Sequence, residues 1–189
     1  YRSGELKYKE NYVDGKRDGE RIKYNEKSGL VSEKQNYVDG IQQGEDISYY
    51  PSGAVRIKDN WIDGKKQGEH IENYVSGAID LKANYVDGKL QGEEIQYYES
   101  GEIKTEGYYV DDKKHGEEIS YYESGAVRYK VNYVDWKKQG EYIKYYESGE
   151  VKLKVNYVDG KEQGEWIEYY ENGEIKEIKN YKYGELLEY

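Results

Sequence analysis

The fold follows from residues 140–163, which read GEYIKYYESGEVKLKVNYVDGKEQ. This 24-residue unit recurs along the whole chain in about seven and a half copies. Its aromatic marker recurs at a spacing of 25 residues once and of 24 residues thereafter, at Tyr12, Tyr37, Trp61, Tyr85, Tyr109, Tyr133, Tyr157 and Tyr181. A fixed period of this length is typical of repeat proteins, in which each unit packs on its neighbours.

Each unit contains two short runs with the alternation of a half-buried strand. In the first run, Val151, Leu153, Val155 and Tyr157 share one phase. In the second run, Ile143 and Tyr145 share a phase. A period of two predicts β-strands and excludes amphipathic helices.

Two glycine-bearing segments join the runs. One is Asp-Gly-x-x-x-Gly, in which Asp can bond its own backbone and glycine accepts a positive φ; the other is the tighter Glu-Ser-Gly turn. The second glycine of the longer segment is the predicted structural turn position, at Gly19, Gly44, Gly68, Gly92, Gly116, Gly140 and Gly164. Because short connections require antiparallel neighbours, we expect an all-β antiparallel meander of about sixteen strands.

Positions at which single units differ from the 24-residue pattern lead to further predictions. One extra residue between Gly19 and Gly29 predicts a bulge or a lengthened turn. Asp112 and Trp136 replace the loop glycine, so a positive φ there must be tolerated by other residues. We expect a single repeat domain over residues 1–189, with a partial unit at 1–10 and a shortened C-terminal cap at 181–189 that omits four loop residues.

Composition limits the partners. The chain has 189 residues, 26 Tyr, no Cys and a formal net charge of -10. This acidity disfavours nucleic acid and anionic lipid surfaces as partners, and the absence of a long apolar run argues against insertion into a membrane. No signal peptide is evident, although the start at Tyr1 leaves a removed one open.

The unit resembles the MORN repeat, in the variant common in bacteria. The resemblance rests on Tyr157-Val158-Asp159-Gly160-Lys161, Gly164-Glu165-Trp166 and Tyr169-Tyr170-Glu171-Asn172-Gly173, and every unit carries it. It implies a row of β-hairpins that form an elongated, twisted sheet acting as a non-catalytic interaction scaffold. Some similar proteins are antitoxin-like and others are secreted or surface proteins, which favours a secreted or cell-surface location over the cytoplasm without fixing the compartment.

The sequence offers no catalytic constellation, cofactor motif or thiolate site. His70 and His115 occupy different positions of the repeat, and a solvated loop is the interpretation for His115. The repeated acids form two columns, which turn formation and cross-strand ion pairing explain without a metal ion. One column is Asp14, Asp39, Asp63, Asp87, Asp111, Asp135 and Asp159, and the other begins Glu20, Glu45, Glu69 and Glu93.

Two tyrosine rows are the strongest functional signal. The row Tyr49, Tyr97, Tyr121, Tyr145 and Tyr169 shares the isoleucine phase, and we expect it to pack across strands. If strand geometry persists, the next residue in each unit points to the other face. These residues, alongside Val86, Val110, Val134 and Val158, form the candidate partner-binding row: Tyr50, Tyr74, Tyr98, Tyr122, Tyr146 and Tyr170.

Three functions follow from these features. We expect a scaffold that binds a protein partner through its tyrosine-rich face. A self-assembling structural protein is the first alternative, because the aromatic face or the edge strands near Glu5 to Tyr12 and Glu185 to Tyr189 could pair with another copy. A carbohydrate-binding module is the second, because sugars stack on flat aromatic rings.

Overall fold

A computed structural model describes residues 6–188, and their contacts form two compact units, one up to Leu90 and one from Gln91 onward. We call these the N-terminal unit and the C-terminal unit. Residues 1–5 of the predicted partial unit, and Glu5 and Tyr189 of the predicted edges, lie outside the described residues. The repeat continues through the division between the units, and the single domain over residues 1–189 stays a prediction.

The N-terminal unit contains six long strands and six strands of two residues. The long strands are β4 (Gly19–Tyr24), β5 (Val31–Val38), β7 (Gly44–Tyr49), β8 (Val55–Ile62), β10 (Gly68–Asn73) and β11 (Ile79–Val86). The short strands are β1 (Tyr8–Lys9), β2 (Tyr12–Val13), β3 (Lys16–Arg17), β6 (Ile41–Gln42), β9 (Lys65–Lys66) and β12 (Lys89–Leu90).

The C-terminal unit contains eight long strands and three short ones. The long strands are β13 (Gly92–Tyr97), β14 (Ile103–Val110), β16 (Gly116–Tyr121), β17 (Val127–Val134), β19 (Gly140–Tyr145), β20 (Val151–Val158), β21 (Lys161–Tyr169) and β22 (Ile175–Lys182). The short strands are β15 (Lys113–Lys114), β18 (Lys137–Lys138) and β23 (Glu185–Leu186).

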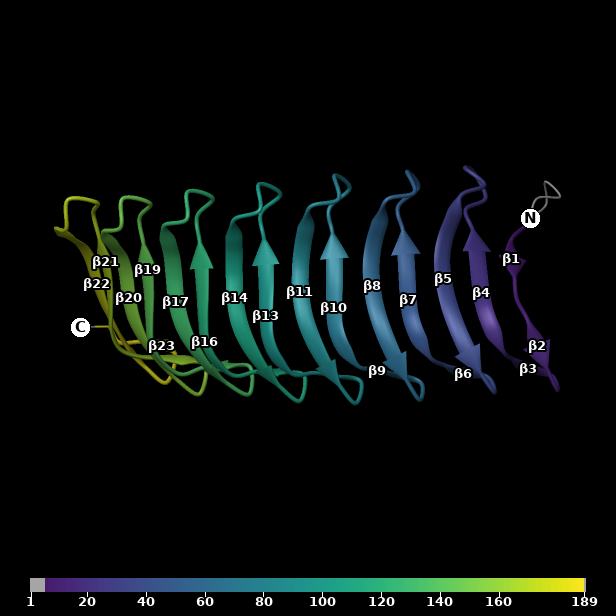
Figure 1. Cartoon of the computed structure of the whole chain (residues 1–189). Coiled ribbons are helices and arrows are strands. Elements are labelled where there is room, and N and C mark those ends of the chain that lie inside the picture. Colours follow the sequence, from purple (N-terminus) through teal and green to yellow (C-terminus); the bar gives the residue numbers. More distant parts are fainter. Residues whose placement is uncertain (1–5, 189) are drawn as a thin grey trace. The chain divides into compact units, whose positions relative to one another are not determined.

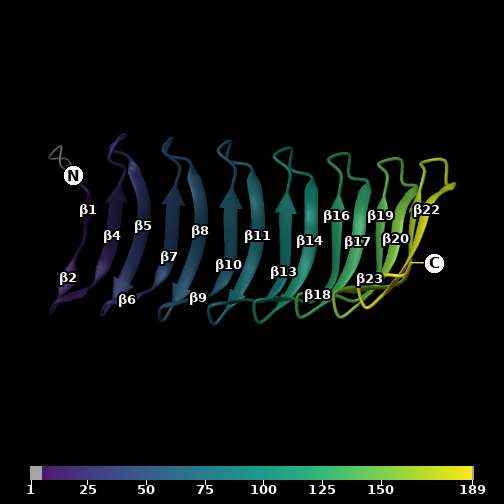
Figure 2. The same ribbon diagram turned by 180° about the vertical axis from the view of Figure 1, so that it is seen from behind.

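Within each unit the long strands follow one another in chain order as an antiparallel meander (Figures 1 and 2). The predicted all-β hairpin repeat is therefore confirmed. The described residues form 23 strands rather than about sixteen, because most repeats add a two-residue strand. The described part of the chain contains no helix that is long and apolar enough to cross a membrane.

The Asp-Gly pair forms the tightest turn of each repeat. Asp159 has a φ of 53° and Gly160 a φ of 80°, and Val158 lies opposite Lys161. Two central residues with positive φ define a type I′ turn, which suits the twist of a hairpin. Asp112 and Trp136 have φ values of 67° and 70°, so the predicted tolerance of other residues at the glycine position is confirmed.

The seven glycines predicted as turn residues have φ between 74° and 94°, as expected, but their position differs from the prediction. Gly140 lies directly after Gln139, whose backbone N–H donates to Asn132 O at 2.9 Å. The strand then continues as β19, so this glycine occupies a bulge and not a hairpin loop. The prediction treated the whole Asp-Gly-x-x-x-Gly segment as one loop, whereas the type I′ turn closes after two residues.

The Glu-Ser-Gly turn closes the other end of each hairpin. Tyr146 N–H donates to Glu150 O at 2.8 Å. In the first repeat the equivalent bond joins Asn25 N–H to Leu30 O at 2.8 Å and encloses one more residue. The predicted lengthened turn is confirmed.

The C-terminal segment corrects one prediction. Tyr183 has a φ of 52° and Gly184 a φ of 84°, and Lys182 lies opposite Glu185. Tyr183-Gly184 is therefore a complete type I′ turn in which Tyr replaces Asp, and no loop residues are omitted. The prediction was wrong because it matched Gly184-Glu185 to the Gly-Glu bulge pair instead of to the Asp-Gly turn.

The two faces of the sheet differ in burial. Residues directly opposite each other share a face, so Glu118 and Val131 lie together, as do Tyr142 and Val155. Val131 and Val155 are only 2% exposed. We call this side the packed face. Of residues 6–188, those that are buried all lie on it, namely Asp59, His70, Ala83, Tyr109, Glu118, Ser120, Val131 and Val155.

The opposite side, which we call the open face, carries the isoleucines of the second run. Ile143 lies opposite Lys154, so it points away from Val155. The tyrosine row that was expected to pack shares this open face, as Tyr121 and Tyr145 show, and it is half-buried. The packed face is instead formed by the apolar phase of the first run, to which Leu153 and Val155 belong.

The left-handed turn leads to a stability prediction. Gly160→Ala should lower the free energy of unfolding by about 1 kcal/mol, because an L-residue resists a φ of 80° although the nearest neighbour of an added Cβ is 3.7 Å away. Gly107→Ala, which lies within β14 without a positive φ, should be neutral or stabilising. Urea unfolding of the two variants measures the difference, and equal effects would contradict the role given to the turn.

Candidate functional site

The open face repeats the same side chains at equivalent places. Its first ladder alternates Glu and Asn, as in Glu45 opposite Asn60 and Glu141 opposite Asn156. Its second ladder alternates Ile and Lys, as in Ile119 opposite Lys130. The glutamates of the first ladder are exposed. In the second ladder the isoleucines of the second run are half-buried, and so are the lysines except Lys58, which is exposed.

An apolar row borders these ladders beside the type I′ turns. Its exposed fractions run from 37% to 57%. In the N-terminal unit the row contains Val13, Val38, Ile62 and Val86, and in the C-terminal unit it contains Val110, Val134 and Val158. The open face thus combines exposed β-branched side chains with exposed carboxylates.

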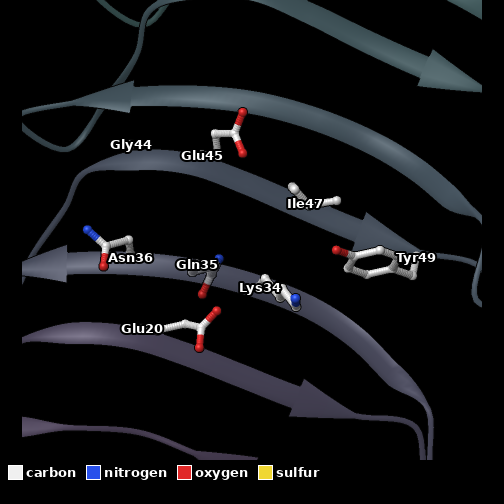
Figure 3. Close-up of a pocket in the computed structure, with 8 residues that line it drawn as sticks. All are labelled: Glu20, Lys34, Gln35, Asn36, Gly44, Glu45, Ile47 and Tyr49. Carbon is white, nitrogen blue, oxygen red and sulfur yellow. The ribbon is translucent and has the colours of Figure 1, made fainter.

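Shallow hollows lie between successive repeats on the open face. Figure 3 shows one in the N-terminal unit, between β4, β5 and β7, lined by Glu20, Lys34, Gln35, Asn36, Gly44, Glu45, Ile47 and Tyr49. An equivalent hollow in the C-terminal unit is lined by Glu93, Glu106, Gly107, Tyr108, Glu117 and Ile119. Glu106 replaces the lysine that most other units have, so this hollow holds three carboxylates.

The candidate partner-binding tyrosines lie at the border of the open face. The strands end at the preceding residue, so the alternation that predicted the other face stops before this row. Tyr98, Tyr122 and Tyr146 carry the cations of Lys104, Arg128 and Lys152 over their rings at 5.9, 6.0 and 5.0 Å. Tyr170 is 50% exposed, and the rest of the row is half-buried.

Four hydroxyls of this row bond to the following repeat within the same unit. Tyr98 Oη donates to Tyr121 O at 2.7 Å, and Tyr122 Oη donates to Tyr145 O at 2.8 Å. The same bond links Tyr50 to Asn73 O and Tyr146 to Tyr169 O. Each of these rings is therefore held by a hydrogen bond at its far end, a role that single-sequence reasoning did not anticipate.

The exposed acids beside the turns form ion pairs between successive repeats. Lys137 Nζ lies 3.2 Å from Asp159, and Lys65 Nζ lies 3.5 Å from Asp87. These pairs are largely exposed, so each contributes little to stability. Ion pairing of the aspartate column is confirmed for these members. Among residues 6–188, no group of three or more His, Cys, Asp or Glu side chains is arranged to hold a metal ion.

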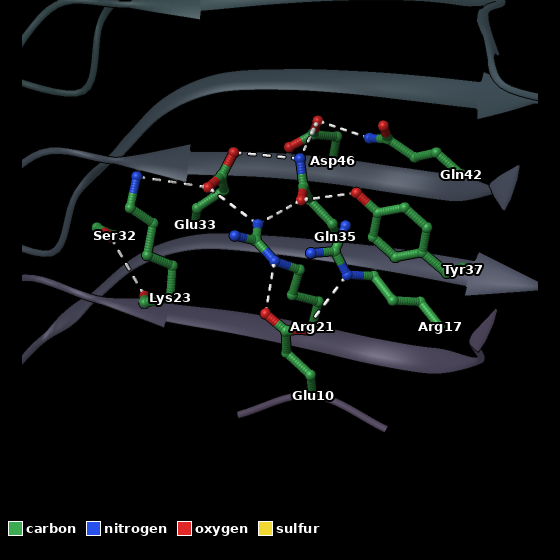
Figure 4. Close-up of polar contacts among 10 residues, drawn as sticks. All are labelled: Glu10, Arg17, Arg21, Lys23, Ser32, Glu33, Gln35, Tyr37, Gln42 and Asp46. Atoms are coloured by element: carbon green, nitrogen blue, oxygen red, sulfur yellow. Dashed lines mark hydrogen bonds and ion pairs between the residues drawn. The ribbon is translucent and has the colours of Figure 1, made fainter. Parts of the chain in front are cut away.

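The packed face of the N-terminal unit is a polar network. Arg21 bonds Glu10 at 3.2 Å and Gln35 at 2.7 Å, and Gln35 reaches Asp46 on the next hairpin at 3.1 Å (Figure 4). Such a network stabilises the face only when its members satisfy one another.

His70 continues this network on β10. Its Nδ1 lies 2.6 Å from Asp59 and its Nε2 lies 3.1 Å from Glu72. Lys66 pairs with the other oxygen of Asp59 at 3.0 Å, and the Tyr85 ring meets the imidazole edge-on. His70 is 6% exposed and Asp59 7% exposed. Both ring nitrogens therefore face carboxylates, which suits an imidazolium.

The electrostatics follow from this geometry. Burial alone would lower the pKa of His70, but the hydrogen bond and charge of Asp59 outweigh it and raise the pKa above its usual value. Burial opposes ionisation of Asp59 as well, yet His70 and Lys66 hold the pKa of that carboxyl below its usual value. The sequence signal that could have revealed this pair is the presence of Asp59 and His70 on the packed phases of adjacent strands.

The packed face of the C-terminal unit is aromatic instead. Lys114 forms an ion pair with Glu118, and its ammonium lies over the rings of Tyr109 and Tyr133 at 5.6 and 5.2 Å. Glu118 also accepts the Tyr129 hydroxyl at 2.8 Å. Burial raises the pKa of Tyr133 to about 12. These groups satisfy one another, so this face offers few unused polar atoms.

The His70 pair gives a pH prediction. A raised pKa in the folded state stabilises the fold below the unfolded pKa near 6.5, and this contribution is lost as the pH rises through the folded value. The stability of the N-terminal unit should therefore fall above about pH 6.5, and His70→Gln should remove that dependence. Chemical unfolding at a series of pH values measures it, with exposed His115→Gln as the control. A slope retained in His70→Gln would contradict the assignment.

The hydroxyl bonds give a second prediction. Tyr146→Phe removes the donor to Tyr169 O, and because that carbonyl is partly buried, the free energy of unfolding should fall by about 1 kcal/mol. Tyr170→Phe makes the same change at a tyrosine that is 50% exposed and should have a smaller effect. Urea unfolding compares the two variants, and an equal loss would exclude the inter-repeat role.

Comparison with known proteins adds one match. A family model described as MORN repeat variant matches residues 90–111, 114–135, 138–159 and 162–183. A search of curated proteins found no match. Each matched stretch contains the bulge glycine and the tyrosine pair described above, and it ends at the first central residue of the type I′ turn.

Proposed function

Because this chain is a MORN-repeat protein of the variant type over residues 90–183, we propose that it is a scaffold that binds a protein partner along its open face. MORN repeats and a repetitive β-sheet fit a non-catalytic repeat scaffold, and MORN repeats generally mediate protein interactions. The partner that we propose is a toxin, as for antitoxin-like proteins, or a surface or host protein.

The observation that carries this proposal is the regularity of the open face. An exposed valine (Ile62 in one repeat) and an exposed glutamate recur beside a half-buried isoleucine, at positions set by equivalent hairpin registers. A continuous row of exposed apolar side chains rimmed by polar ones is a feature of protein interaction sites. A partner that contacts one repeat can contact the next in the same way.

The tyrosine row supports the proposal. Its hydroxyls are held by backbone carbonyls and its rings by cations, so the side chains are fixed before a partner arrives. Binding then costs less side-chain entropy than it would with mobile rings. Tyrosine is also enriched at interfaces because its ring is large and rigid.

The histidines supply no evident catalytic base. His70 engages carboxylates through both ring nitrogens. His115 stands alone on an exposed loop position, and no metal-binding group accompanies it among the described residues.

Replacing the tyrosine row tests the proposed function. The triple variant Tyr98→Ala, Tyr122→Ala, Tyr146→Ala should lose the partner, because it removes the rings. The triple Phe variant keeps the rings, so it should retain the partner with reduced stability. Affinity capture from the source organism on the immobilised chain, followed by mass spectrometry, compares both variants with the unaltered chain.

Circular dichroism of the Ala variant controls for loss of the fold. Capture of the same proteins by the folded Ala variant would contradict binding through the row. Capture of only further copies of this chain, with a concentration-dependent mass in light scattering, would favour the self-assembly alternative.

A further inference from the structure

We propose that the open face of the C-terminal unit docks a basic amphipathic helix whose side-chain pattern repeats every seven residues. This inference rests on the proposed function and names the kind of partner. It follows from the spacing of the rows, from their width and from the charge of this unit.

The spacing matches a helix. One repeat contains two neighbouring long strands, so its side chains recur every ~9.6 Å along the sheet. Seven residues of an α-helix span about 10.5 Å. The C-terminal unit presents the rows Glu93, Glu117, Glu141 and Glu165, and Ile95, Ile119, Ile143 and Ile167. A difference of about 1 Å per repeat adds up to about 3 Å over three intervals, which flexible side chains accommodate.

The width also matches. The valine row, the Glu/Asn ladder and the Ile/Lys ladder are two residues apart on a strand, as Val158, Asn156 and Lys154 show on β20. The two outer rows are therefore about 13 Å apart. A helix is about 10–12 Å across with its side chains. Centred over the Glu/Asn ladder, it can place apolar side chains on both flanking rows.

A helix suits this face better than an extended segment does. The open face presents side chains, because the backbone groups of the inner strands pair with neighbouring strands. An extended peptide lying across it would leave its own N–H and C=O groups without regular partners. A helix satisfies those groups internally, so its docking needs only side-chain contacts.

The negative charge of the C-terminal unit favours a basic helix as the partner and this unit as its binding site. Residues 91–189 contain 14 Lys and Arg against 23 Asp and Glu, a net charge of -9, whereas residues 1–90 contain 15 against 16. The glutamate row of the C-terminal open face is exposed, at Glu93, Glu117, Glu141 and Glu165. A basic partner is therefore attracted to the C-terminal unit before contact, and its Lys or Arg side chains face the carboxylates afterwards.

The hollow at Glu106 provides a starting point for the register. Tyr121 Oη donates to Glu106 at 2.5 Å, and Glu106 lies opposite Ile95 and Ile119. Its carboxylate lines the same hollow as Glu93 and Glu117. Ile119 and Tyr108 line the same hollow. A Lys or Arg of the helix can lay its alkyl stem on these two side chains and its charge among the carboxylates.

Designed peptides of about 28 residues, long enough to form a helix in water, test the inference. One peptide carries Lys every seven residues with apolar residues on both flanks, and the other has the same composition in scrambled order. Fluorescence anisotropy with the full chain should show at least about tenfold tighter binding of the ordered peptide, and added salt should weaken it.

Two chain variants with equal net charge locate the site. Glu117→Lys with Glu141→Lys reverses the open-face row and should weaken binding of the ordered peptide at least about tenfold. Glu123→Lys with Glu147→Lys, at the exposed hairpin turns, makes the same change of charge elsewhere and should weaken it far less.

Three outcomes would overturn the inference: no binding of the ordered peptide, equal binding of the scrambled peptide, or equal losses in the two charge variants. If the peptide result is negative while capture still depends on Tyr98, Tyr122 and Tyr146, the helix is wrong and the scaffold stands. If neither peptide binding nor partner capture depends on residues of the open face or its tyrosine row, the proposed function fails as well.

Discussion

The structure depends on two successive residues with positive φ in every repeat. They close a type I′ turn, and the turn sets which residues of the two flanking strands stand opposite each other. A slip of one residue would exchange the faces, moving Val155 to solvent and Lys154 to the packed side. The bulge at the following glycine then directs the chain into the next long strand without losing that register.

Given this register, the two faces have different freedom to vary. The packed face requires only that neighbours satisfy each other, and it does so with His70 and Asp59 in one unit and with Tyr142 and Val155 in the other. The open face keeps its rows nearly constant. Residues vary on the packed face, where their contacts are internal, and stay regular on the open face, where a partner can contact them. This difference fits a surface whose spacing matters for binding a partner.

Much of this architecture was predictable because its determinants are local. Alternation identified the strands, and Asp-Gly identified the turn even where Asp112 or Trp136 replaces glycine. Local signals could not decide between Tyr142 and Ile143 as the packed residue, because both are apolar and only the strand opposite settles the choice. The same limit hid the His70–Asp59 pair and the hydroxyl bonds, which join residues 11 and 23 positions apart. The binding role of the tyrosine row and the number of domains stay predictions.

The hydroxyl bonds run in one direction, from each tyrosine to the carbonyl ahead of the next one. An extra repeat inserted between two others would bring its own tyrosine donor for the repeat after it. Its own carbonyl would accept the hydroxyl of the repeat before it, so the pattern of hydrogen bonds would be kept. In-frame duplication or loss of 24 codons would therefore be tolerated more readily than a shorter change. Evolution can then change the length of the protein by whole repeats, while the contacts within and between repeats stay the same.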